Sequence, residues 1–333
     1  MRENDDRKAA LKKLRTLVYS TKQDVEIYRK NLEDVFYAPI LPNHVECHER
    51  IYSGISCDLL MPVVYSSKRI MIYIHGGCFV GGSKKAWRGF CSTLAAASSC
   101  RVLIPEFRLA PAYAFPAAIE DVQNVFRGLY MEEQIACSLD GGDAKSAVPE
   151  IIVAADGSGA SIALALVQSL KDKFKNCISN IILFSPWLNL SPSSEVILKK
   201  KLKDEILTGD CVRRSGDVYT YTSNLENKLV SPVFAEKEDF QGFPPVFIQM
   251  GEKEILRPDA EKFAQKLRDA KVMCTMDVWP GMVYMFQMAD EYLYEAHLAI
   301  EKVGKLITQK PEELDYETLH RSPVLESSLN SEA

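Results

Sequence analysis

The chain has 333 residues, of which 47% are hydrophobic and 26% are charged, and this globular composition excludes a wholly disordered chain. The formal net charge of -5, without a long basic stripe, argues against nucleic acid as a partner. No apolar run reaches the roughly 18 residues of a membrane-spanning helix, so we expect no membrane span. The charged start lacks the apolar segment of a secretory signal.

The nine cysteines are scattered singly, without a CxxC pair, which is typical of buried, reduced thiols. We therefore expect a cytoplasmic protein. We also expect neither a metal nor a cofactor. The sequence leaves the oligomeric state open.

Regular elements follow one another along the chain. Residues 5–36 are predicted to be helical, because leucines recur at helical spacing between charged residues. Residues 45–62 are predicted to form two strands around a turn. Short apolar strands then alternate with helices, which predicts a mostly parallel sheet covered on both faces, with ligands at the carboxyl ends of its strands. The predicted strands are 70–74, 101–105, 151–155, 181–185, 246–250 and 272–278, and a final helix is predicted from about Met288.

Three loops after predicted strands carry the motifs. The first, His75-Gly76-Gly77-Cys78-Phe79, is called the HGG loop below; its glycines let backbone N–H groups approach a ligand closely, as an oxyanion hole requires. The second runs over 106–111 (Glu-Phe-Arg-Leu-Ala-Pro) and on to 115–121 (Phe-Pro-Ala-Ala-Ile-Glu-Asp). The third, over 155–159 (Ala-Asp-Gly-Ser-Gly), is a strand-to-helix turn of small residues.

In this order and spacing, the loops resemble the hormone-sensitive lipase, or GDXG, family of α/β-hydrolases over about residues 70–286. The resemblance implies an α/β-hydrolase fold, with a mostly parallel twisted sheet flanked by helices and a helical cap. The cap would comprise N-terminal helices in residues 1–40 and an insertion at 190–230 within a core of 41–308. The polar composition of 309–333 predicts a disordered tail.

The family hydrolyses acyl esters with a Ser–Asp/Glu–His triad, whose serine lies on a G-x-S-x-G elbow. The family's Gly-Asp-Ser-Ala-Gly-Gly falls on residues 155–160, so the resemblance places the nucleophile at Gly157. It places the base at Tyr284 and the acid at Glu254. A tyrosine, whose ordinary pKa is about 10, is a poor base near pH 7. None of the five histidines falls at the base position; they are His44, His48, His75, His297 and His320.

The resemblance also implies an oxyanion site. It falls on the HGG loop, in which His75 would shape the loop while Gly76, Gly77 and Cys78 present backbone groups. The backbone N–H of Ser158 would be the third donor.

Without the serine and the histidine, we expect little esterase turnover, since losing either residue alone costs on the order of 10⁶ in kcat in one serine protease. The sequence thus predicts a catalytically impaired pseudoenzyme that binds a small carboxylate or an acyl ester in the retained pocket. Glu254 would be a structural carboxylate hydrogen-bonded to Tyr284.

Other interpretations remain open. An active carboxylesterase could use Ser158 as nucleophile, although a turn centred there places Asp156, a poor fit, at a crowded position. The site could instead have decayed neutrally. The fold could also serve as a protein-interaction module.

Overall fold

The computed structural model describes residues 2–20, 23–41, 44–66, 68–139, 148–198 and 204–308. The predicted tail at 309–333 lies outside the described residues. Within them, no helix has both the length and the apolar character needed to cross a membrane.

One eight-stranded sheet forms the centre of the molecule, in the order β1-β2-β4-β3-β5-β6-β7-β8. β1 and β2 pair with each other in antiparallel fashion, β2 pairs antiparallel with β4, and the remaining pairs are parallel. This confirms the predicted mostly parallel sheet. The strands are β1 (Glu46–Tyr52), β2 (Ile55–Met61), β3 (Arg69–Ile74), β4 (Arg101–Pro105), β5 (Glu150–Asp156), β6 (Ile178–Phe184), β7 (Val246–Gly251) and β8 (Cys274–Trp279).

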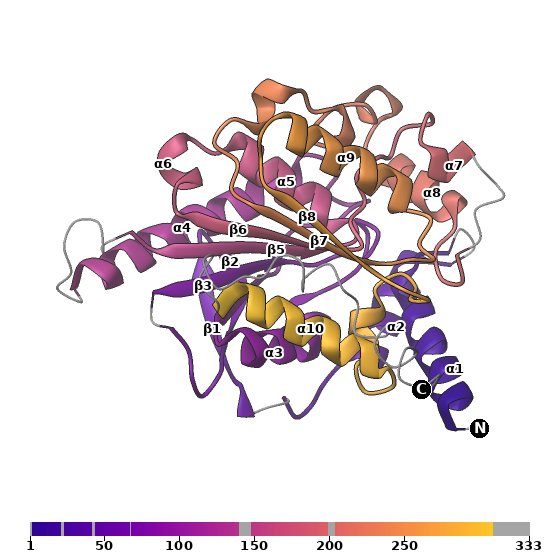
Figure 1. Ribbon diagram of the computed structural model, residues 1–333, viewed down its shortest axis with the longest axis horizontal. Helices are drawn as coiled ribbons and strands as arrows, with labels where there is room; N and C mark the ends of the chain where they lie inside the picture. Colours follow the sequence, from indigo (N-terminus) through magenta and orange to yellow (C-terminus); the bar gives the residue numbers. More distant parts are fainter. Residues whose placement is uncertain are drawn as a thin grey trace, which may run out of the picture.

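Helices cover both faces of the sheet (Figure 1). α3 (Lys84–Ser98) and α10 (Tyr294–Thr308) lie together on one face, and α4 (Ala117–Leu139), α5 (Gly159–Ser169), α6 (Asp172–Lys175) and α9 (Arg257–Asp269) lie on the other. The central strands β3, β5 and β6 are rich in Ile and are buried on both faces, as expected for parallel strands between helical layers. This packing holds the loops at the strand ends in place.

Two predicted helix boundaries were wrong. The segment 5–36 is not one helix: α1 (Arg2–Leu14) and a 3₁₀ turn, η1 (Arg15–Leu17), are followed by a separate helix, α2 (Val25–Phe36). The break occurs because Asp24 caps α2, its carboxylate accepting hydrogen bonds from the backbone N–H groups of Glu26 and Ile27. The last helix starts at Tyr294 and not near Met288, because a short 3₁₀ turn, η6 (Phe286–Ala289), precedes it.

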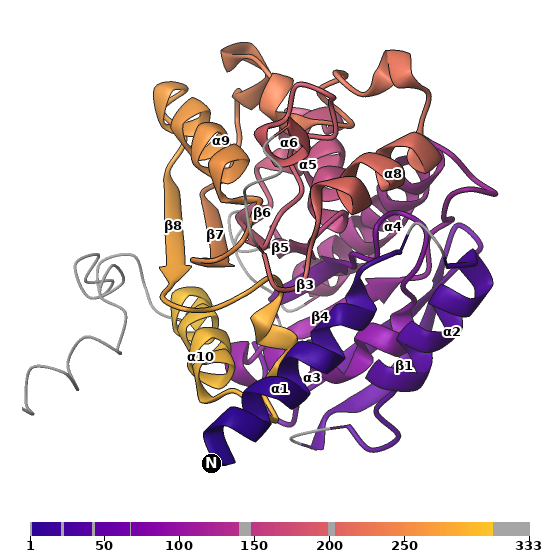
Figure 2. The ribbon, with the colours of Figure 1, turned by 90° about the vertical axis from the view of Figure 1, so that its right-hand side faces the viewer.

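The N-terminal helices and two helices of the 190–230 segment gather at one end of the sheet. α1, α2 and α8 (Gly209–Tyr219) lie in front of the carboxyl ends of the parallel strands in Figure 2, and α7 (Glu195–Leu198) precedes α8 in the chain. We call residues 15–19 together with α8 the covering segments, because both contact the HGG loop.

Candidate functional site

The turn after β5 is tight and is centred on Gly157. This glycine has a φ of +46°, a left-handed conformation that glycine adopts at little cost. Its N–H donates to the carbonyl of Phe184 (3.0 Å), and its carbonyl accepts from the N–H of Trp187 (2.9 Å). A Cβ on Gly159, two residues on, would collide with the carbonyl oxygen of Ile74. The small residues needed around the turn therefore flank position 157, whereas Ser158 has helical dihedrals.

The side chain of Tyr284 fills the space above this turn. A Cβ built on Gly157 would collide with the Tyr284 hydroxyl, and would lie 3.5 Å from its Cζ and 3.9 Å from Trp187 Nε1. Tyr284 is buried, and burial, followed by the nearby Cys78, raises its pKa well above the ordinary value. Its hydroxyl therefore stays neutral and cannot serve as a base near pH 7.

Glu254 lies beyond the end of β7, where the resemblance places the acid. Its Oε1 accepts hydrogen bonds from Ser185 Oγ (2.8 Å) and from the N–H of Gly251 (2.5 Å). Oε2 is buried without a partner among the described residues, so the expected hydrogen bond to Tyr284 is absent and that expectation was wrong. The nearby backbone N–H and hydroxyl satisfy the carboxyl group instead. Burial raises the pKa of Glu254 to about 8, so the group is largely protonated at neutral pH.

The HGG loop is held by its glycines and by Asp156. Gly77 has a φ of +103°, and a Cβ there would collide with the carbonyl oxygen of Gly81. Oδ1 of Asp156 accepts from the N–H of Gly76 (3.0 Å), Tyr73 Oη (2.9 Å) and Trp87 Nε1 (2.7 Å). These contacts tie the loop to the turn at Gly157.

His75 is part of this support. Its ring stacks on Phe107 with the centroids 4.3 Å apart, and its Nδ1 lies 2.8 Å from the carbonyl oxygen of Gly76. Burial lowers its pKa to about 4, so the ring is neutral. His75 thus supports the rest of the HGG loop by packing against Phe107.

Ser158, the alternative nucleophile, is buried and its hydroxyl is engaged. The backbone N–H of Phe79 donates to its Oγ at 3.1 Å, which joins the start of α5 to the HGG loop. Among the described histidines, His48 lies beside Glu46, His297 beside Glu301, and His75 bonds to the loop itself. Within the described residues, His44 included, no histidine forms a hydrogen bond to Ser158 that could make it a base for this serine.

The covering segments, which lie in the regions predicted to form the helical cap, contact the HGG loop through residues that the sequence analysis did not single out. The N–H of Tyr19 donates to Cys78 Sγ (3.4 Å), and Cys211 Sγ of α8 lies 3.9 Å from the same sulfur. Tyr28 of α2 donates to the carbonyl of Leu17 (2.7 Å). Cys78, Tyr19, Tyr28 and Cys211 are all buried. No local pattern could have indicated these contacts, because their partners are far apart in the sequence.

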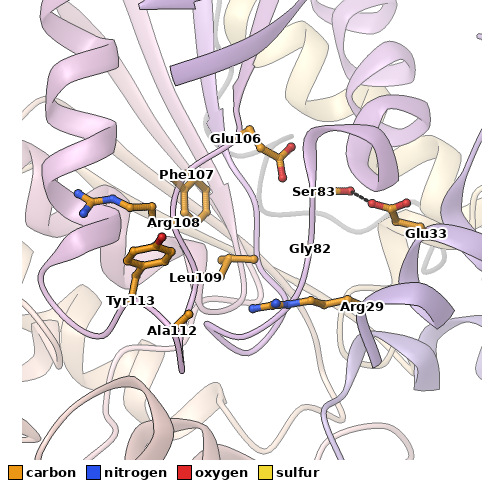
Figure 3. A pocket seen from close by; sticks show the side chains of 10 residues that line it. All are labelled: Arg29, Glu33, Gly82, Ser83, Glu106, Phe107, Arg108, Leu109, Ala112 and Tyr113. Atoms are coloured by element: carbon orange, nitrogen blue, oxygen red, sulfur yellow. Dashed lines mark hydrogen bonds between the residues drawn. The ribbon is translucent and has the colours of Figure 1, made fainter. Parts of the chain in front are cut away.

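A surface pocket of about 270 Å³ lies elsewhere, between α2 and the segment after β4 (Figure 3). None of the predicted site residues lines it; its lining residues are Arg29, Glu33, Gly82, Ser83, Glu106, Phe107, Arg108, Leu109, Ala112 and Tyr113.

The charged groups of this pocket already have partners within the chain. Arg29 donates to the carbonyls of Val80 (2.8 Å) and Ala110 (3.1 Å), and Ser83 Oγ donates to Glu33 (3.1 Å). We therefore assign no ligand to it. In the part of the chain that the structure describes, no group of three or more His, Cys, Asp or Glu residues could hold a metal ion.

Comparison with known proteins agrees with this architecture. Residues 71–288 match the family described as alpha/beta hydrolase fold. An esterase of Acinetobacter venetianus is 30% identical over 245 residues, which are 73% of this chain and 76% of that protein. An acetyl-hydrolase of Streptomyces hygroscopicus is 29% identical over 239 residues, 72% of this chain and 75% of that protein.

Solved structures share the fold. An esterase from the bacterial hormone-sensitive lipase family has a TM-score of 0.78 and 24% identity, over 91% of this chain and 97% of that one. A hormone-sensitive lipase from a metagenome library has a TM-score of 0.76 and 24% identity, over 91% and 98%. The motifs, the family match and the esterase relatives together show that this chain belongs to the α/β-hydrolase fold family, in its GDXG or hormone-sensitive lipase group.

Proposed function

We propose that this chain is a catalytically impaired member of the esterase group, a pseudoenzyme that keeps the hydrolase fold without the triad chemistry. The observation that carries the proposal is the contact between positions 157 and 284. A glycine stands at the nucleophile position, and the hydroxyl of Tyr284 occupies the space into which a nucleophile side chain would extend.

The protonation states of the neighbouring groups support the same proposal. A working triad needs an ionised carboxylate that orients a histidine. Here burial raises the pKa of Glu254 to about 8, and its second oxygen faces no histidine. Burial also keeps Tyr284 neutral by raising its pKa. Neither group can take a proton from a nucleophile near pH 7.

We propose further that the HGG loop binds the carboxylate of a small acid or the carbonyl of an acyl ester through its backbone N–H groups. Glycines that leave those groups accessible favour such a ligand. Cys78 is 1% exposed and Tyr284 is 2% exposed, so binding requires the covering segments to move aside. A ligand that binds only this opened state would bind slowly.

Initial rates of p-nitrophenyl acetate and butyrate hydrolysis test the impairment. We expect the natural protein to be silent, the Gly157→Ser variant to be silent, and the Gly157→Ser/Tyr284→His variant to turn over, because only the last has both a nucleophile and a base. Esterase activity of the natural protein that follows the protein through purification would contradict the proposal. A fluorophosphonate adduct at Ser158 would then favour the alternative carboxylesterase.

Ligand binding has its own test. Thermal unfolding is measured in the presence of a series of short-chain and aromatic carboxylates, for the natural protein and for a Gly77→Val variant, whose side chain would collide with the carbonyl oxygen of Gly81 and so displace the loop. A rise in Tm for the natural protein alone supports binding at the loop. A flat response across the series argues for a decayed site.

We also propose a cytoplasmic location. All nine cysteines are free thiols and seven of them are buried, as is typical of proteins from reducing compartments. Cell fractionation followed by immunoblotting tests this, and recovery in a secreted fraction would contradict it.

A further inference from the structure

Two thiols meet where the covering segments contact the HGG loop. Cys78 Sγ and Cys211 Sγ are 3.9 Å apart, although 133 positions separate the residues in the sequence. We propose that Cys78 and Cys211 form an oxidisable dithiol, which a peroxide converts into a disulfide between the HGG loop and α8. This modification site goes beyond the proposed function and does not depend on it.

The position of each sulfur is fixed by its surroundings. Cys78 itself has a φ of +58°. Its side chain points to the covering segments, where the N–H of Tyr19 donates to its Sγ. Cys211 lies in the first turn of α8, where its N–H donates to the capping Thr208 Oγ1 (3.2 Å). A disulfide bond is about 2.05 Å long, so bond formation requires the two sulfurs to approach by about 2 Å from their distance of 3.9 Å.

The surroundings also give the two sulfurs different roles. Burial alone would raise the pKa of Cys78, but hydrogen bonds, the one from Cys211 first and then the one from the Tyr19 N–H, lower it. The hydrogen bond to Cys78, together with burial, raises the pKa of Cys211. When Cys78 is protonated, its S–H points to the carbonyl of Leu17 (3.5 Å). Cys78 is thus the attacking thiolate and Cys211 the resolving thiol.

The reaction balances with hydrogen peroxide as the oxidant. The Cys78 thiolate attacks one peroxide oxygen, the O–O bond breaks, and hydroxide leaves and takes up a proton to form water; Cys78 becomes a sulfenic acid. The sulfur of Cys211 then attacks the Cys78 sulfur, the S–O bond breaks, and hydroxide leaves with the Cys211 proton as a second water. Two thiols lose two electrons in total, and one peroxide is reduced to two waters.

The bond would lock α8 onto the HGG loop. Because it closes a loop of more than 100 residues, it also restricts the unfolded chain strongly, and we expect Tm to rise by about 5 °C. Oxidation would therefore hold α8 against the HGG loop, and a thiol reductant would release it.

Mass spectrometry of the natural protein tests the proposal. The folded protein is treated with hydrogen peroxide, digested without reduction and mapped. We expect a Cys78–Cys211 cross-linked peptide, an intact mass lower by about 2 Da, and reversal of both by dithiothreitol. In a Cys211→Ser variant, dimedone should label Cys78. In a Cys78→Ser variant, Cys211 should stay unlabelled.

Cys91→Ser is the matched control, because Cys91 is a buried thiol of α3 for which the structure describes no thiol partner. It should form the cross-link as the natural protein does. Three results would overturn the proposal: no cross-link in the folded protein, oxidation of other cysteines while Cys78 and Cys211 stay reduced, or a cross-link that forms only in urea. Mapping of the natural protein decides among these even if a variant fails to fold.

Discussion

The hydroxyl of Tyr284 lies so close to the backbone of residue 157 that a Cβ at this residue would collide with it. The family resemblance places the base and the nucleophile of a triad at these two positions, and the contact means that the residues at 284 and 157 constrain each other. A serine cannot be restored at 157 while the tyrosine keeps this position. A smaller residue at 284 would leave a cavity beside the glycine, and a buried cavity also lowers the free energy of unfolding.

The first prediction concerns this coupling. Gly157→Ala should lower the free energy of unfolding by about 2–3 kcal/mol, because the new Cβ meets the Tyr284 hydroxyl at a backbone with positive φ. In a Tyr284→Phe background the same substitution should cost about 1–2 kcal/mol less. Urea unfolding of the four proteins measures the coupling.

Gly281→Ala is the matched control for that cycle. Gly281 has a φ of +69°, and a Cβ there would meet nothing within 4 Å, so this variant should show only the backbone cost of about 1 kcal/mol. Equal losses at 157 and 281, or additive effects of 157 and 284, would mean that the Tyr284 hydroxyl does not restrict position 157.

The second prediction concerns Glu254 as the remaining acid. If Gly157→Ser/Tyr284→His restores ester hydrolysis, adding Glu254→Gln should reduce kcat by a factor of about 10³–10⁴, as losing the triad carboxylate does in a serine protease. Glu252→Gln is the control, because Glu252 only accepts a hydrogen bond from the exposed N–H of Gly281. If Glu254→Gln left kcat unchanged, the assignment of the acid position would be wrong.

The third prediction is a pH dependence of stability. The pKa of Glu254 is raised by burial from 4.5 to about 8, so the folded state binds a proton that the unfolded state has lost between these values. The contribution of Glu254 to the free energy of unfolding is fully present below about pH 4.5 and is lost as the pH rises to about 8. The slope due to this group is at most about 1.4 kcal/mol per pH unit.

Burial also raises the pKa of Asp156 to about 7, so this residue makes the free energy of unfolding depend on pH with the same sign. The Glu254→Gln variant keeps Asp156, so the difference between the variant and the natural protein isolates the contribution of Glu254. Urea unfolding at pH 5, 7 and 9 should show the variant gaining stability relative to the natural protein as the pH rises. A difference that stays constant with pH would show that Glu254 titrates normally.

The fourth prediction concerns Ser158. Ser158→Ala removes the acceptor for the buried N–H of Phe79 and should cost about 1–3 kcal/mol of unfolding free energy. Background ester hydrolysis should not change, because the described contact of the hydroxyl is with the N–H of Phe79 and not with a histidine. Ser161→Ala, three residues along α5, is the control: its hydroxyl is also buried and donates to the carbonyl of Trp187 (2.6 Å). Loss of activity in Ser158→Ala alone would point to a catalytic serine.

Much of the fold was predictable from local patterns. The apolar runs predicted every parallel strand to within about three residues. The inner strands are buried on both faces, which requires short, continuous apolar segments. The break between α1 and α2 was missed because a capping Asp24 outweighs continuing helical periodicity. The sequence placed Gly157, Glu254 and Tyr284 in loops after predicted strands, and they do follow β5, β7 and β8.

The sequence by itself therefore determined the α/β architecture, and the family resemblance gave the residues proposed for the triad positions. Only the tertiary structure decided what those residues contact. The Tyr284 hydroxyl meets position 157, Glu254 bonds to Ser185 rather than to Tyr284, and Cys211 reaches Cys78. The physical reason is that hydrophobic periodicity indicates which face of a helix or strand is buried. These contacts instead join side chains that are far apart in the sequence and that only the packed fold brings together.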